Sequence, residues 1–414
     1  MTSKSEKKYL ERLVIKYSQN KKLSKNKYPL VADPFTSKDM ISGIETLLKG
    51  RITMSETTKK FEREFAKYIG AKYALMVNSG SSANLLAFFA LINPKSRKKL
   101  KSGDECILPS ICWSTSLWPI VQAGLKPRFV DVNLDTFNID IEKLKKKITK
   151  KTKAILSVHV LGNSTNMNDL KKIVKKNRLI LIEDTCESLG SKFGSKCLGT
   201  FGRFGTYSFF VSHQISAGEG GMIVCNDYND YKILHSLRAH GWDRGLNKSK
   251  KNNFNFINSG FNLRPLDITA SIGYNQFKRL NQMIKIRAAN RKKIISSVKK
   301  SSDWNSQIDF LNPIKKLKPS WFGLPILINK KFLSKKNRYL KFLNKNGIET
   351  RPIISGNFLN QPSIKLYNLN KKKEYFKNAQ EIEERGFFIG LHTERIKQKT
   401  VKFLTNKLLK IDRI

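Results

Sequence analysis

The chain alternates between short apolar runs and amphipathic stretches from about residue 71 onward. Runs typical of buried strands lie at residues 73–77, 105–109, 127–132, 154–160, 179–183, 206–210 and 221–225. Stretches with helical spacing lie between them, at residues 83–92, 141–148 and 168–175. Because near-continuous apolar strands alternate with helices, we expect a mostly parallel sheet that is buried on both faces.

The pattern changes after Asp267. Apolar residues at helical spacing, from Ile272 through Leu280 to Ile295, predict one long helix, and strand-like segments follow near residues 321–328 and 347–354. A chain of 414 residues also exceeds one hydrophobic core of usual size. We therefore expect three parts. They are a lysine-rich arm, either a short helix or mobile, over residues 1–27, a large α/β domain over 28–280 and a smaller C-terminal α+β domain over 281–414.

The charge of the chain is strongly positive, with 79 Lys and Arg against 32 Asp and Glu, a formal net charge of +47. Such a charge could indicate nucleic acid, an anionic membrane surface or a phosphorylated substrate. Lysine outnumbers arginine, however, and is scattered from end to end rather than interleaved with aromatic residues. We expect no nucleic-acid partner and no membrane partner, whereas a phosphate-bearing substrate would still be attracted.

The cysteines and the N-terminus bear on the compartment. Five cysteines without CxxC or zinc-like spacing predict neither a disulfide framework nor a metal site. The first residues contain no apolar segment of signal-peptide length, and no later run reaches the roughly 20 apolar residues that cross a bilayer. We expect a soluble protein of the reducing cytoplasm.

Two segments carry candidate chemistry at the ends of expected strands. The turn at residues 78–82, Asn-Ser-Gly-Ser-Ser, could cradle a phosphate with backbone N–H groups, although a plain N-capped turn would look the same. Glu183 and Asp184 stand together at the C-terminal end of the expected buried strand near residues 179–183. A carboxylate there could keep a pyridine nitrogen protonated, but metal binding and capping of the following helix stay open.

A third segment, GTYSFFVSHQISAGEGG at residues 205–221, completes a recognisable order of motifs. The glycine-serine turn, the Glu-Asp strand, this loop and its glycine-rich turn together resemble the DegT/DnrJ/EryC1 sugar aminotransferase family, from about Tyr28 to the C-terminus. The resemblance implies the pyridoxal phosphate (PLP)-dependent transferase type I fold of aspartate aminotransferase. That fold has a large, mostly parallel sheet domain and a smaller C-terminal α+β domain.

His213 stands where the family's aminotransferases carry the lysine that forms a Schiff base with PLP. No lysine occurs from Tyr207 to Gly221, and histidine cannot form that bond. The segments RAHGWDR, GFNLRPLD, SWFG and RPIISGNF resemble those of family members that are dehydratases. The resemblance implies removal of the C3 hydroxyl from a nucleotide-linked 4-keto-6-deoxyhexose, with GDP and a mannose-derived ring favoured. Pyridoxamine phosphate (PMP) would be the working cofactor, L-glutamate the amino donor and His213 the acid and base, in the synthesis of 3,6-dideoxysugars for surface polysaccharide.

The resemblance also implies roles for further residues. Trp113 would stack on the pyridine ring, Asp184 would pair with its nitrogen and Glu187 would lie near its hydroxyl. Asn262 would reach the phosphate bound by the other subunit, which implies a homodimer with shared active sites. The remaining residues form two groups: Gly80, Ser81 and Ser208 at the phosphate, and His240, Arg244, Phe254, Arg351 and the turn 355–357 at the substrate.

Three alternatives stay open at this point. A true sugar aminotransferase would use a lysine from elsewhere in the chain. A related dehydratase of CDP-4-keto-6-deoxyglucose binds a [2Fe-2S] cluster and works with a reductase; residues 241–260 contain no cysteine, so we expect neither cluster nor reductase. A basic nucleic-acid-binding protein on a retired enzyme scaffold would bind no cofactor, and its binding would fall steeply with salt.

Overall fold

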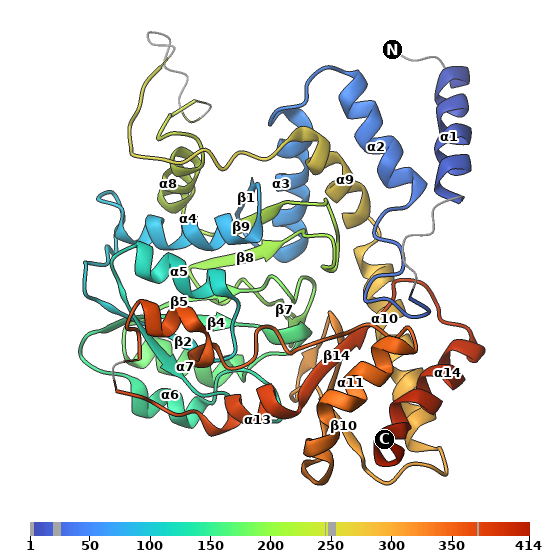
Figure 1. Ribbon diagram of the computed structural model, residues 1–414. Coiled ribbons are helices and arrows are strands. Elements are labelled where there is room, and N and C mark those ends of the chain that lie inside the picture. The colour runs from blue at the N-terminus through green and yellow to red at the C-terminus, as the bar shows by residue number, and fades with distance from the viewer. Residues whose placement is uncertain (1–3, 20–25, 245, 247–253, 371) are drawn as a thin grey trace.

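A seven-stranded sheet forms the centre of the molecule in the computed structural model, which describes residues 4–19, 26–244, 246, 254–370 and 372–414. The strands follow the order β1-β9-β8-β5-β4-β2-β3 (Figure 1). Neighbours from β8 to β3 are parallel, whereas β9 runs antiparallel to both β1 and β8. The expected mostly parallel sheet is therefore confirmed. Its strands are β1 (Tyr73–Val77), β2 (Glu105–Pro109), β3 (Lys126–Val130), β4 (Thr152–Val158), β5 (Ile180–Asp184), β8 (Phe204–Ser208) and β9 (Gly221–Cys225).

Both faces of this sheet are covered by helices, because side chains along each strand alternate between two apolar layers. In β1, Leu75 and Val77 join one buried cluster while Met76 joins another; in β5, Ile182 and Leu181 divide in the same way. One face packs against α4 (Gly80–Ile92), α5 (Ser114–Gln122) and α8 (Tyr228–Arg238) (Figure 1). The other packs against α3 (Glu56–Ile69), α6 (Ile141–Lys147) and α7 (Met167–Lys176).

A second, antiparallel sheet lies in the C-terminal part of the chain, in the order β10-β12-β14-β13. Its strands are β10 (Ile308–Phe310), β12 (Gly323–Ile328), β13 (Thr350–Arg351) and β14 (Gly386–Gly390). Around it lie α11 (Lys336–Lys345), α13 (Lys377–Arg385) and α14 (Gln398–Leu408) (Figure 1). The short α12 (Pro362–Leu366) ends before Tyr367, whose ring packs on Trp118 of the large domain. A smaller α+β unit thus follows the large sheet, while the boundary at residue 280 stays a prediction.

Short elements join the two sheets. A three-stranded sheet pairs β11 (Leu317–Lys318) with β6 (Lys192–Phe193), which in turn pairs with β7 (Lys196–Cys197). Single 3₁₀ turns lie at Val160–Gly162, Lys330–Lys335, Phe358–Asn360 and Leu409–Arg413.

The single long helix expected after Asp267 is wrong. The chain forms two helices instead, α9 (Asp267–Phe277) and α10 (Leu280–Lys299). The break falls at Lys278 and Arg279, where Nη2 of Arg279 donates to both carboxylate oxygens of the buried Asp39, at 2.7 Å each. This charge-assisted contact to a buried carboxylate favours the break over the helix continuity that the apolar spacing suggested.

The N-terminal segment begins with a helix, α1 (Lys4–Gln19), which packs against α2 (Ser37–Leu48). Farther on, Tyr28 is completely enclosed by the C-terminal unit: its hydroxyl donates to the carbonyl of Gly390 at 3.1 Å and its ring stacks on His392. Leu30 donates its N–H to the Glu349 carboxylate at 3.1 Å. Residues 28–31 are therefore built into the C-terminal unit despite their place in the chain.

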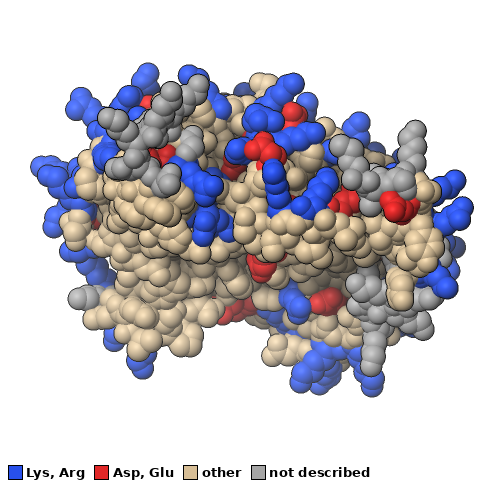
Figure 2. All heavy atoms as spheres, turned by 90° about the horizontal axis from the view of Figure 1, so that it is seen from above, with Lys and Arg blue, Asp and Glu red and all other residues tan. Residues whose placement is uncertain are grey.

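Basic side chains are spread over the face of the molecule seen in Figure 2. In the view from above, Lys and Arg lie around most of the outline, with Asp and Glu among them, and do not gather in one patch (Figure 2). In the described part of the chain, no helix combines the length and the apolar character that crossing a bilayer requires.

Candidate active site

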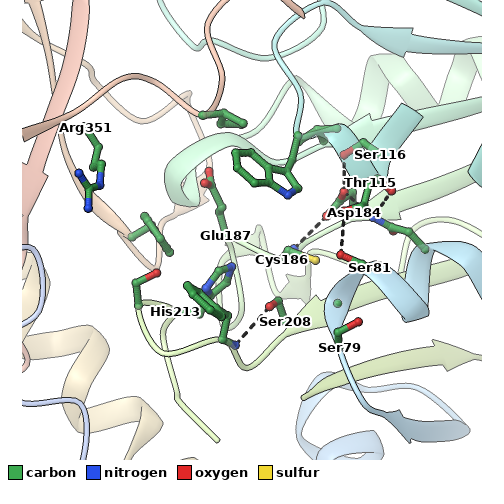
Figure 3. Close-up of a pocket in the computed structure, with 18 of the residues that line it drawn as sticks. Ser79, Ser81, Thr115, Ser116, Asp184, Cys186, Glu187, Ser208, His213 and Arg351 are labelled. Carbon is green, nitrogen blue, oxygen red and sulfur yellow. Dashed lines mark hydrogen bonds between the residues drawn. The ribbon is translucent and has the colours of Figure 1, made fainter. Parts of the chain in front are cut away.

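A cavity of about 530 Å³ opens at the carboxyl ends of β4, β5 and β8, where open α/β sheets bind their ligands. The large sheet contributes the turn before α4, the start of α5, the end of β5 and the loop after β8. The C-terminal unit contributes Phe322, Arg351 and Phe388, and the N-terminal segment adds Leu30 and Val31. Figure 3 shows Ser81, Thr115, Ser116 and Asp184 at one end of this cavity and Arg351 at the other, with Glu187 and His213 between.

Asp184 lies at the floor of the cavity, and only 5% of it is exposed. Its Oδ2 accepts hydrogen bonds from the side chains of Asn84 (2.8 Å) and Ser116 (2.7 Å). Its Oδ1 accepts the backbone N–H of Cys186 at 3.2 Å. Asn84 is itself fixed, because its Oδ1 accepts the hydroxyl of Thr206 at 2.6 Å. This network holds a carboxylate in one orientation and leaves a lone pair of Oδ1 for a ligand.

The turn at the start of α4 can bind an anion. The Ser79 side chain caps the helix by accepting the N–H of Ser82, and the first intrahelical bond starts at Ala83, so the amides of Gly80 and Ser81 precede it. A Cβ on Gly80 would lie 2.6 Å from the Cβ of Ser208, so only glycine lets this turn approach the end of β8. The expected phosphate residues are thus brought together.

Trp113 and Glu187 line the walls. Trp113 precedes α5 and is 56% exposed, so its ring offers an uncovered aromatic face in the cavity. Glu187 accepts the N–H of Leu161 at 2.9 Å. Burial, with the negative charge of Asp184 as a smaller contribution, raises the pKa of Glu187 to about 7 despite that bond. Glu187 can therefore donate as well as accept a proton near neutral pH.

His213 lies in a turn closed by its own N–H, which donates to the carbonyl of Phe210 at 2.9 Å. Its ring meets Phe322 of the C-terminal unit nearly edge to face, with centroids 5.1 Å apart. Nδ1 is buried and has no hydrogen-bond partner among the described residues, so Nε2 is the nitrogen left to face the cavity. Burial first, and the charge of Arg287 second, lower the pKa of His213 to about 3. The imidazole is a neutral base.

The C-terminal unit supplies the remaining wall. Arg351 is in the cavity and forms an exposed ion pair with Glu349 at 2.9 Å, so its guanidinium can exchange partners at little cost. The turn 355–357 lies behind the cavity lining, where the hydroxyl of Ser355 donates to the carbonyl of Cys112 at 2.6 Å. None of the described residues that line the cavity is a lysine.

Four expected site residues lie outside this cavity. Asn262 and His240 are exposed, and within the described part of the chain the side chain of Asn262 accepts only from Arg264, at 3.0 Å. Phe254 is 69% exposed and stacks on Trp242, and the guanidinium of Arg244 also lies over the ring of Trp242. The chain between them, residues 245 and 247–253, lies outside the described residues, and it includes part of the cysteine-free segment 241–260. Within one chain these four residues do not join the site.

Sequence reasoning missed the residues that bond to, or pack against, the expected site residues. Asn84 carried a usable signal, because it is an amide in an otherwise apolar helix, one turn after Gly80. Ser116, Thr115 and Cys186 carried none, since small polar residues near loops are common. Phe322 was quoted within the motif SWFG, but nothing in the sequence placed its ring against His213.

Comparison with known proteins is consistent with this geometry. The model of the DegT/DnrJ/EryC1/StrS aminotransferase family matches residues 36–408. A GDP-4-keto-6-deoxy-D-mannose 3-dehydratase of Escherichia coli O55:H7 is 40% identical over 377 residues, which cover 88% of this chain and 95% of that protein.

Two solved structures are similar over almost their whole length. One is GDP-4-keto-6-deoxymannose-3-dehydratase with a histidine replaced by asparagine and GDP-perosamine bound; it has a TM-score of 0.85 and 38% identity, and covers 92% of this chain and 100% of that one. The other holds a trapped PLP-glutamate geminal diamine, with a TM-score of 0.82, 38% identity and the same coverage. The chain belongs to the DegT/DnrJ/EryC1/StrS aminotransferase family.

Proposed function

We propose that this protein is a PLP-dependent 3-dehydratase that acts on GDP-4-keto-6-deoxymannose. The observation that carries the proposal is His213, a neutral imidazole facing a cavity whose described lining contains no lysine. An aminotransferase of this fold needs a lysine amine in the same cavity. The relatives at 40% and 38% identity named above bear the dehydratase name, which supports the same substrate.

The residues of the cavity fit pyridoxal phosphate. The amides of Gly80 and Ser81, with the hydroxyl of Ser208, would hold its phosphate, and Trp113 would cover one face of its ring. The free lone pair of Asp184 Oδ1 would accept the proton of its ring nitrogen. When bound, the cofactor supplies an electron sink for the breaking of a bond on the attached sugar.

The side chains then move protons at defined atoms. Three donors fix the carboxylate of Asp184 in one orientation, from which it would accept a hydrogen bond from the ring nitrogen. His213 accepts a proton at Nε2 and returns it to the hydroxyl that leaves C3 of the sugar as water. Glu187, with a pKa near 7, would share a proton with the ring oxygen.

Glutamate completes the cycle. A trapped adduct of PLP with glutamate in a similar structure supports L-glutamate as the amino donor. The balance is that the sugar loses one oxygen, glutamate becomes 2-oxoglutarate and its nitrogen leaves as ammonia. Arg351, half exposed at the open end of the cavity, is the cation available to an anionic substrate group. We place the reaction in the cytoplasm, as a step toward a 3,6-dideoxysugar of surface polysaccharide.

We further propose that two copies of the chain share their active sites. His240, Arg244, Phe254 and Asn262 are exposed and outside the cavity of their own chain, as residues that serve a partner would be. Mixing a His213→Asn chain with an Asn262→Ala chain tests this. Partial recovery of activity in the mixture supports shared sites, and an inactive mixture that still forms dimers contradicts them.

The function is tested by incubating the protein with PLP, L-glutamate and GDP-4-keto-6-deoxymannose. We expect a sugar product that lacks one oxygen atom, together with ammonia and 2-oxoglutarate in equal amounts. An aminotransferase would instead give an amino sugar and no ammonia. The CDP-linked 4-keto-6-deoxyglucose serves as the comparison substrate, and faster turnover of that sugar would contradict the GDP assignment.

A His213→Lys variant separates the two reactions on one scaffold. The new amine should capture PLP in a bond that borohydride makes permanent, and dehydration should fall by at least about 100-fold. His213→Asn is the control, since it should lose dehydration without capturing PLP. Unchanged dehydration in either variant contradicts the role given to His213.

A further inference from the structure

Arg287 is a buried cation that the proposed chemistry does not use. It lies on α10 with 5% of its surface exposed, and it does not line the cavity. Its Nη2 donates to the backbone carbonyl of His213 at 3.4 Å. Among the described residues, its Nε and Nη1 have no hydrogen-bond partner and no carboxylate forms an ion pair with it.

Such a group is costly for the fold. Taking a guanidinium out of water without a counter-ion costs several kcal/mol, and proteins normally pair it or replace it with an apolar residue. The cost is visible in the pKa of Arg287, which burial lowers to about 10. A buried, unpaired arginine directly behind a reactive histidine therefore calls for an explanation in terms of that histidine.

We propose that Arg287 is a positioning residue for His213, which holds the backbone carbonyl of that histidine and places an uncompensated positive charge behind its imidazole. Two consequences follow. The cation opposes protonation, so His213 starts as a neutral base, and it makes the protonated ring a stronger acid toward the departing hydroxyl. Burial and the charge of Arg287 both lower the pKa of His213, and burial is the larger of these two causes.

Other groups around the imidazole do not replace this charge. Nδ1 has no partner, and the two nearest rings, Phe210 and Phe322, are apolar. The orientation of the imidazole therefore depends on packing and on the backbone that Arg287 holds. The charged side chains that line the same cavity are Asp184, Glu187, Glu219 and Arg351.

The neighbouring Arg291 provides a matched control. It lies one helical turn farther along α10, and burial lowers the pKa of this arginine to about 10 as well. Its guanidinium, however, lies 4.3 Å above the ring of Trp321 and donates to the carbonyl of Leu311, without a contact to His213. Replacing Arg291 by Met removes an equal charge from the same helix while leaving the support of His213 in place.

The first test uses the protein without cofactor or substrate, so it does not depend on the proposed function. Histidine Cε1 is labelled with carbon-13, and the His213 signal is assigned by its loss in His213→Asn. Removing a nearby cation raises the pKa of an imidazole, so Arg287→Met should move the titration of His213 upward by about one unit. At about pH 4.5 the signal of the unaltered protein stays at its neutral position and that of the variant shifts. Arg291→Met should resemble the unaltered protein.

The second test uses turnover and therefore rests on the proposed function. We expect Arg287→Met to lower kcat about tenfold and to leave the KM for the nucleotide sugar within about twofold. Arg287→Lys, which keeps the charge, should recover most of that loss and also serves if the Met variant does not fold. An unmoved His213 titration in a folded Arg287→Met protein overturns the proposal, as does a raised KM with unchanged kcat. Absence of turnover in the unaltered protein would instead count against the function.

Discussion

Asp184 and His213 both line the cavity, and their surroundings are built in opposite ways. At one end, Asp184 receives three hydrogen bonds, and the groups that donate them are themselves held by Thr206 and by the start of α5. Farther along the cavity, between this end and Arg351, the imidazole of His213 has no partner on Nδ1 among the described residues, and a cation rather than a carboxylate contacts its backbone carbonyl. One group is surrounded by donors, and the other is isolated.

The difference matches what each group has to do. A carboxylate that must hold one ligand atom throughout a reaction gains from every donor, because donors fix its orientation. A base that must take up a proton and give it back gains from the opposite, since a stabilising partner would trap the proton. Asp184 and His213 can be replaced separately, which makes the comparison testable.

The largest effect on turnover should come from neutralising Asp184. In Asp184→Asn the three donors lose an ionised partner and the ring nitrogen loses its counter-charge, so turnover should fall on the order of 10³-fold. Steady-state assays at saturating PLP measure this. Activity within tenfold of the unaltered protein would mean that the carboxylate is structural only.

A smaller effect is expected when a single donor is removed. Ser116→Ala leaves Asn84 on the same oxygen of Asp184, and one hydrogen bond to a charged group is worth about 1.5 kcal/mol or more, so turnover should fall roughly tenfold. Ser157→Ala is the matched control, because the Ser157 hydroxyl is equally buried but has no partner. Equal losses in both variants would show that the hydroxyl acts through packing.

The next prediction concerns the free energy of unfolding rather than turnover, and it depends on His213. The pKa of His213 is about 3 in the folded protein and 6.5 in the unfolded chain, so the unfolded chain alone takes up a proton as pH falls from 6.5 toward 3. This uptake destabilises the fold in acid. His213→Asn should therefore lose less stability between pH 7 and pH 5 than the unaltered protein, by about 2 kcal/mol, as measured by urea unfolding at both values.

Replacing Glu187 should change the pH dependence of stability in the opposite direction, in the same experiment. Its pKa is raised to about 7 in the fold, so the folded protein takes up the proton first as pH falls, and that uptake stabilises it. Glu187→Gln should lose more stability between pH 7 and pH 5 than the unaltered protein. Parallel changes in both variants would mean that other groups dominate the acid response.

The sequence was sufficient for the elements whose signal is local. The strand ending in Glu183 and Asp184 is apolar along its length, and the turn before α4 combines small residues with a following helix, so both were predicted nearly to the residue. The place of His213 followed from a resemblance in motif order rather than from periodicity. These elements have in common that residues close to them in the sequence were enough to predict them.

Features that depend on distant contacts could not be predicted. The break between α9 and α10 depends on Arg279 reaching Asp39, which is 240 positions away. The partners of Asp184 come from α4 and α5, and the ring against His213 comes from the C-terminal unit. Arg287 looked like any other basic residue of a lysine-rich chain, because burial cannot be read from its spacing.

The enclosed Tyr28 has a practical consequence for shortened versions of the protein. Its backbone pairs with Gly347 and Glu349, and the following Leu30 and Val31 form part of the cavity wall. Trimming the chain up to residue 25 would remove only α1 and the segment after it, so affinity tags or deletions there should be tolerated. A deletion that extends six residues farther would leave the pocket open to solvent on one side. The recombinant enzyme would then be harmed by a change made nearly 200 positions before His213.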